Sequence, residues 1–125
     1  MPTIVDRARE YDGFESDDQA ADTVDAVLET LAERLSQGEA EDIAESLPGR
    51  YADEVRGPAP RHPQEYSVVE FLDRVEERAD IEHGRREERV AAAMTAVADA
   101  VPDEEVARAR EQLPDEYDRL FGADS

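Results

Sequence analysis

Among the side chains of this 125-residue sequence that could carry out chemistry, the first to consider are its two histidines, His62 and His83. Together with Asp80, Glu82 and Glu87, His83 could supply a set of metal ligands, because imidazole and carboxylate groups both bind divalent metals. Their spacing matches none of the recurring ligand motifs, such as two histidines separated by three residues on a helix. The sequence therefore predicts two solvated loop histidines rather than a metal site.

Carboxylates are so numerous that neighbouring pairs must arise by chance. Adjacent pairs stand at Glu76-Glu77, Glu87-Glu88 and Glu104-Glu105. General acid catalysis needs a buried carboxyl group with a raised pKa, whereas most of these acids fall on the polar faces of their expected helices. The acidic stretch 11–18 also lacks the ligand spacing of a calcium-binding EF-hand loop. The carboxylates therefore predict a solvated acidic surface.

Other motifs for catalysis or cofactor binding are missing from the sequence. It contains no cysteine, which excludes disulfides, thiolate metal sites and thiol catalysis. It has no Gly-rich phosphate loop, no serine-nucleophile motif and no dinucleotide-binding fingerprint. We therefore expect a protein that is not an enzyme and that uses no cofactor.

The arginines form one local cluster, made of Arg74, Arg78, Arg85, Arg86 and Arg89. A nucleic-acid-binding surface would use such a cluster, but glutamates are interleaved with these arginines throughout. Glu70 and Arg74, for example, have the i,i+4 spacing and order of a favourable helix pair. The net charge of -20 further opposes phosphate binding, so we expect salt-bridged helix faces and no nucleic-acid partner.

The charge balance is the most unusual property of the composition. The sequence has 34 Asp and Glu against 14 basic residues, and every one of those 14 is arginine. At molar salt the electrostatic screening length falls to about 3 Å, which removes most of the resulting self-repulsion. A GC-rich genome would explain the missing lysine but not the excess acid, and a disordered acidic chain would not show the apolar periodicity described below. The composition therefore predicts a halophilic protein that needs salt to fold.

The sequence also predicts where in the cell the protein is found. No apolar run approaches the roughly 20 residues needed to span a bilayer, so we expect no membrane contact. The first residues lack the basic region and apolar core of a signal peptide. These features predict a cytoplasmic protein.

The apolar residues recur with a helical period. In the first half they mark one face of a helix about five turns long, formed by Ala20, Val24, Val27, Leu28, Leu31 and Leu35. Capping boxes begin at Ser16, Ser36 and Ser67, where a hydroxyl group and the side chain three residues later can satisfy the first backbone amides. No sustained alternation rich in β-branched residues indicates a strand. The pattern predicts an all-α protein.

The stretch from Gly57 to Gln64 cannot be helical, because it contains three prolines in six residues. The apolar patterns on its two sides match each other, with a shift of 66 for most of the chain and 67 for the first helix. The Leu-Pro-x-x-Tyr run at 47–51 recurs at 113–117, and Asp6-Arg7 recurs as Asp73-Arg74. We infer an internal duplication.

The duplication predicts a division of the chain into repeat 1 (1–57), a Pro-rich connector (58–66), repeat 2 (67–122) and a short tail (123–125). Each repeat is expected to hold four helices, near 3–11, 17–35, 37–46 and 49–56, and near 67–79, 84–101, 103–112 and 115–121. A repeat of about 60 residues supports its own core only marginally. We therefore expect two pseudo-symmetric four-helix repeats packed into one helical domain.

The segment 26–48 resembles the signature of the domain of unknown function 2267 family, in its two-repeat, haloarchaeal form. The matching residues are Leu35 to Glu39, Asp42-Ile43-Ala44 and Leu47-Pro48, and the second repeat matches more weakly. The resemblance implies a short helical protein of a kind found in archaea and bacteria. It implies no activity, substrate or catalytic residue.

These observations predict a non-enzymatic helical module that mediates macromolecular interaction or self-association through a protein partner. The candidate interaction surface is the groove between the repeats, near Tyr51, Val55, Tyr117 and Phe121. For the two tyrosines we also expect a structural role, with the ring buried against a long helix and the hydroxyl group at its edge. The alternative is a small-ligand or metal-sensing domain, which would need a closed pocket with buried polar groups.

Overall fold

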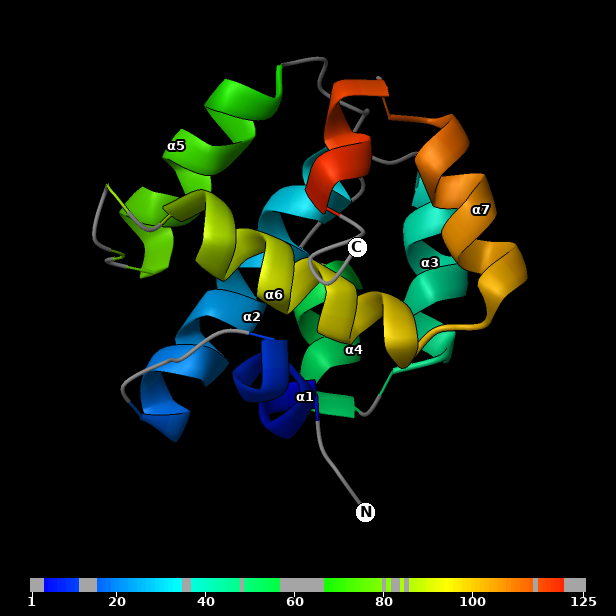
Figure 1. Ribbon diagram of the computed structural model, residues 1–125. Coiled ribbons are helices and arrows are strands. Elements are labelled where there is room, and N and C mark those ends of the chain that lie inside the picture. The colour runs from blue at the N-terminus through cyan, green and yellow to red at the C-terminus, as the bar shows by residue number, and fades with distance from the viewer. Residues whose placement is uncertain are drawn as a thin grey trace.

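The structure is a computed structural model that describes residues 4–11, 16–34, 37–47, 49–56, 67–79, 81, 84, 86–113 and 115–120. Within these residues the chain forms a series of helices (Figure 1), in the order α1 (Ile4–Tyr11), α2 (Asp17–Arg34), α3 (Gln37–Glu45), α4 (Gly49–Arg56), α5 (Val68–Ala79), α6 (Arg86–Asp99), α7 (Asp103–Glu111) and the 3₁₀ helix η2 (Asp115–Leu120). No strand occurs in these ranges, and the predicted all-α class is confirmed.

Two of the predicted capping serines lie in the described ranges, and both cap their helices. The Oγ of Ser16 accepts a hydrogen bond from the backbone N–H of Gln19 (3.1 Å) at the start of α2. The Oγ of Ser67 accepts one from the backbone N–H of Glu70 (3.3 Å) at the start of α5. Such bonds satisfy amides that have no acceptor within the helix, which explains why α2 and α5 begin where the sequence predicts. Ser36 lies outside the described residues.

The final element differs in kind from its expected counterpart α4, because η2 is a 3₁₀ helix rather than an α-helix. It has only six residues, and 3₁₀ geometry is common in such short pieces. Its apolar residues Tyr117 and Leu120 are nevertheless fully buried. The segment therefore still contributes to the core although it is not α-helical.

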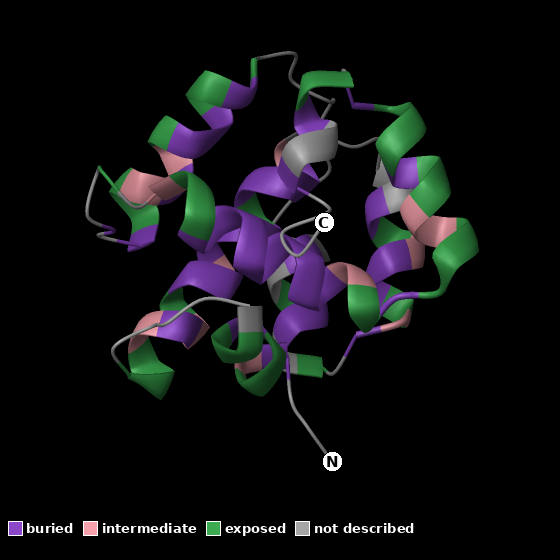
Figure 2. Ribbon diagram, in the orientation of Figure 1, coloured by how far each residue is buried: buried purple, intermediate pink, exposed green. Residues whose placement is uncertain are grey.

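One hydrophobic core draws its side chains from both halves of the chain. The long helices α2 and α6 pack against each other in the centre, where Figure 2 shows most of the buried residues. Leu28 on α2 and Met94 on α6 are both completely buried. Every residue from Arg89 to Val97 is buried, and the alanines among them allow the neighbouring helices to approach α6 on all sides.

The packing between the halves is reciprocal. Helix α1 packs on α6, in the other half, and α5 packs on α2. Helices α3 and α7 lie side by side and join the halves at a third place (Figure 1). The order of the elements and these contacts agree with two related repeats, and the duplication itself stays a prediction.

The predicted connector (58–66) and tail (123–125) lie outside the described residues. None of the helices that the structure describes combines the length and the apolar character that crossing a membrane requires.

Candidate interaction surface

Three of the four residues predicted to form an interaction surface lie in the core rather than on the outside. Tyr51 is 7% exposed, Val55 2% and Tyr117 0%, and all three belong to the hydrophobic cluster. Phe121, the fourth residue, lies outside the described residues. Because these side chains are buried in the folded chain, a partner that docks on its outside has to meet other residues. The buried ring predicted for both tyrosines is what the structure shows.

Tyr117 holds the C-terminal part of the chain against the start of α5. Its hydroxyl group donates a hydrogen bond to the backbone oxygen of Ser67 (3.2 Å), and its ring meets that of Phe71 edge to face, with centroids 5.4 Å apart. Beside it, Glu116 Oε1 accepts a hydrogen bond from the backbone N–H of Val68 (2.5 Å). This placement buries the apolar ring in the core while the hydroxyl group keeps a hydrogen-bond partner at the edge.

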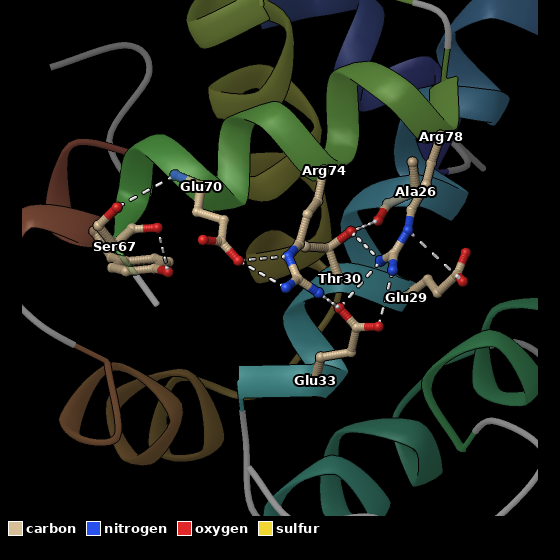
Figure 3. A network of polar contacts seen from close by, with 9 residues as sticks. Ala26, Glu29, Thr30, Glu33, Ser67, Glu70, Arg74 and Arg78 are labelled. Carbon is tan, nitrogen blue, oxygen red and sulfur yellow. Dashed lines mark hydrogen bonds and ion pairs between the residues drawn. The ribbon is translucent and has the colours of Figure 1, made fainter. Parts of the chain in front are cut away.

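The most extensive polar cluster in the described residues joins α5 to α2 (Figure 3). Arg74 donates to Glu33 Oε1 (3.3 Å), and Arg78 donates to both carboxylate oxygens of Glu33 (3.2 and 2.9 Å). The Glu33 side chain is only 13% exposed, so water screens these ion pairs less than it screens surface pairs. Glu33 thus links the two arginines of α5 to the C-terminal end of α2.

Further groups complete this cluster. Arg74 also pairs with Glu70 on its own helix (2.7 Å), which confirms the pair predicted from the i,i+4 spacing. Arg78 donates to Thr30 Oγ1 (2.8 Å), and that hydroxyl group donates in turn to the backbone oxygen of Ala26 (2.7 Å). The sequence did not indicate the bridge to Glu33, because no local spacing relates residues more than 40 positions apart.

Replacing Glu33 with glutamine is expected to lower the free energy of unfolding by about 1–3 kcal/mol, because it leaves two partly buried guanidinium groups without their shared carboxylate. The matched control is Asp17→Asn, which removes the 2.5 Å ion pair with Arg9 at a site where the two side chains are 72% and 42% exposed. That change is expected to cost less than about 0.5 kcal/mol. Urea unfolding of both variants in molar KCl measures the difference, and equal losses would contradict the structural role of Glu33.

The remaining members of the arginine cluster are also engaged in contacts between elements. Arg86 pairs with Asp73 and lies 3.3 Å from Glu76, both on α5. Arg89 is buried and donates to Gln19 Oε1 on α2 (2.6 Å). The prediction of salt-bridged helix faces is confirmed for Arg74, Arg78 and Arg86. Arg89 instead bonds to a neutral amide, and Arg85 lies outside the described residues.

The histidine-centred metal site considered from the sequence falls largely outside the described residues, which include neither of the histidines and neither Asp80 nor Glu82. Its remaining member, Glu87, is exposed on α6. Among the residues that the structure describes, no group of His, Asp or Glu is arranged to hold a metal ion. Of the adjacent acid pairs, both members of Glu87-Glu88 are exposed, and in the other two only Glu76 and Glu105 are half-buried.

An apolar pocket opens between α2, α3, α6 and α7. Its volume is about 20 Å³, enough for one water-sized group, and it is lined by Leu31, Ile43, Met94, Val97, Ala98, Val101, Val106 and Ala109. Ile43 and Ala109, which are counterparts in the predicted register, both line it. The pocket offers no polar group to orient a ligand, so we interpret it as a small gap in the packing of the core.

Comparison with known proteins places this helical arrangement in a family. A search of curated proteins finds no match. The family described as "Uncharacterized conserved protein (DUF2267)" matches residues 2–120, which is nearly the whole chain and includes the segment whose residues resemble its signature. The chain therefore belongs to the DUF2267 family of uncharacterized conserved proteins.

Proposed function

We propose that this chain is a non-enzymatic helical module that acts by contacting another macromolecule or a further copy of itself. The proposal rests on one observation: the polar groups with the most contacts join helices of the chain to one another. Glu33, Arg74 and Arg78 hold α2 to α5, and Ser46 donates to Glu105 (2.8 Å) between the ends of α3 and α7. Groups engaged in this way stabilise a scaffold, and a scaffold acts through the surface that it presents.

That surface is acidic. Most of the described carboxylates are exposed, for example Asp103, Glu104 and Glu111 on α7 and Glu41 and Glu45 on α3. We infer that this surface suits the cytoplasm of a halophile, where salt screens the repulsion between carboxylates. The pocket between α3 and α7 does not itself support a small-ligand sensor, because it has room for a single water-sized group and no polar lining.

Capture of partners at high salt tests the proposal. The tagged chain serves as bait in a halophile extract at about 2 M KCl, where nonspecific attraction to an acidic surface is screened. The control bait carries Val24→Asp and Leu28→Asp, which keep the acidic composition but disrupt the core. We expect a stoichiometric partner, or the chain itself, on the folded bait only, and recovery of the bait when that partner is tagged instead. Equal capture by both baits, together with a monomer at all concentrations, would contradict the proposal.

A further inference from the structure

The contacts that join the two halves occur in equivalent pairs. Helix α1 lies on α6, and its predicted counterpart α5 lies on α2, the counterpart of α6. Arg7 on α1 approaches Asp99 on α6 at 4.0 Å, and Arg74 on α5 approaches Glu33 on α2 at 3.3 Å. With the shifts of 67 and 66 found in the sequence, Arg7 corresponds to Arg74 and Glu33 to Asp99. The same ion pair is therefore made twice, once in each direction.

The apolar residues of α2 and α6 also occur in corresponding pairs, one member in each half. Leu28 on α2 and Met94 on α6 correspond to each other in the predicted register, and both are completely buried on helices that pack against each other. Val24 and Val90 form a second corresponding pair, and both are also completely buried. A contact that uses equivalent patches on both sides is of the isologous type, which in symmetric dimers joins two separate chains.

We propose that the interface between the halves is a protein-interaction surface whose partner is the opposite half of a second copy of this chain. This inference rests on the proposed function and gives self-association a specific geometry. Helix α1 of one copy would lie on α6 of the other, and α5 on α2, with Arg7–Asp99 and Arg74–Glu33 formed between chains. Exchange of identical elements costs little, because the exchanged contacts are those already made within one chain.

The connector decides which pairing prevails. The Pro-rich connector (58–66) tethers the halves, and a short linker that spans its two sites gives an effective concentration on the order of millimolar. At micromolar concentration the intact chain therefore pairs within itself, and exchange becomes visible only when internal pairing is blocked. Exchange is therefore tested with chains in which one half is disrupted and the other half is intact.

Two full-length variants provide that test. One carries Val24→Asp and Leu28→Asp in α2, and the other carries Val90→Asp and Met94→Asp in α6. Each variant alone buries two carboxylates in its core and is expected to be unfolded, because an uncompensated buried charge costs more than a domain can offset. Mixed in molar KCl, the intact second half of the first variant and the intact first half of the other can pair.

The mixture is expected to regain about half the helical circular dichroism of the wild-type chain, since one complete pair of halves forms for every two chains. Light scattering is expected to give twice the 14.0 kDa mass of one chain. The matched control mixes two variants damaged in the same half, with Val27→Asp and Leu31→Asp in the second, and is expected to stay unfolded. A signal equal to the sum of the separate variants, at the mass of one chain, would overturn the inference. Capture of a different partner by the folded bait would still support the proposed function, so the two can fail separately.

Discussion

Replacing Leu28 with alanine is expected to lower the free energy of unfolding by about 3–5 kcal/mol, a large part of the 5–15 kcal/mol typical of a domain this size. Leu28 is completely buried on α2, which packs against α6, so the truncation removes three carbons from the packed core. Met94→Ala, on the other side of the same contact, is expected to cost about 2–5 kcal/mol. Urea unfolding in molar KCl measures both losses.

The control for these variants is Val69→Ala on α5. Val69 is 52% exposed, so its truncation removes little buried surface and is expected to change stability by less than about 0.5 kcal/mol. A loss at Leu28 no larger than the change at Val69 would contradict the position of Leu28 in the core. A large loss at Leu28 with none at Met94 would show that the second half does not share that core.

Lowering the KCl concentration from about 2 M to about 50 mM is expected to unfold the chain, or to lower its melting temperature by 15 °C or more. At the higher concentration the screening length is below about 3 Å, and the exposed carboxylates hardly interact. At the lower concentration it exceeds about 10 Å, so the repulsion within a net charge of -20 acts across neighbouring helices and favours the expanded chain. Thermal melts followed by far-ultraviolet circular dichroism measure the change.

A charge variant tests the cause. The variant carries three substitutions at exposed positions of α7, Asp103→Asn, Glu104→Gln and Glu111→Gln. They reduce the negative charge by three and leave the core residues unchanged. If repulsion between carboxylates sets the requirement, this variant needs less KCl to reach the same melting temperature. Equal cooperative melts of the wild-type chain at both salt concentrations would contradict a halophilic requirement.

The secondary structure could be predicted from sequence because its signals are local. Hydroxyl groups at Ser16 and Ser67 cap the helices that follow them, and the apolar spacing of 17–35 is that of α2 (Asp17–Arg34). The family resemblance in the segment 26–48 is confirmed by the match over residues 2–120. The 3₁₀ geometry of η2 was not predicted, because six residues with one buried tyrosine do not differ in apolar pattern from a short α-helix.

The candidate site could not be predicted in the same way, because it depends on which helices meet. The sequence placed Tyr51, Val55 and Tyr117 near a groove, whereas all three are buried, on elements that pack against helices of their own half. The bridge from Glu33 to Arg74 and Arg78 depends on the contact of α2 with α5, which no local pattern encodes. Every residue of α6 from Arg89 to Val97 is buried. The sequence did not indicate this, because the neighbours of its alanines depend on how the helices pack.

The most direct test of a single core shared by both halves is to cut the chain between them. A protease recognition sequence replaces residues 58–63 of the connector, and the cleaved protein is studied in molar KCl by size-exclusion chromatography and circular dichroism. We expect the two fragments to elute together with the helical signal of the uncut chain, and to separate only in urea. Fragments that elute apart while each keeps its helices would show two independent units and contradict the shared interior.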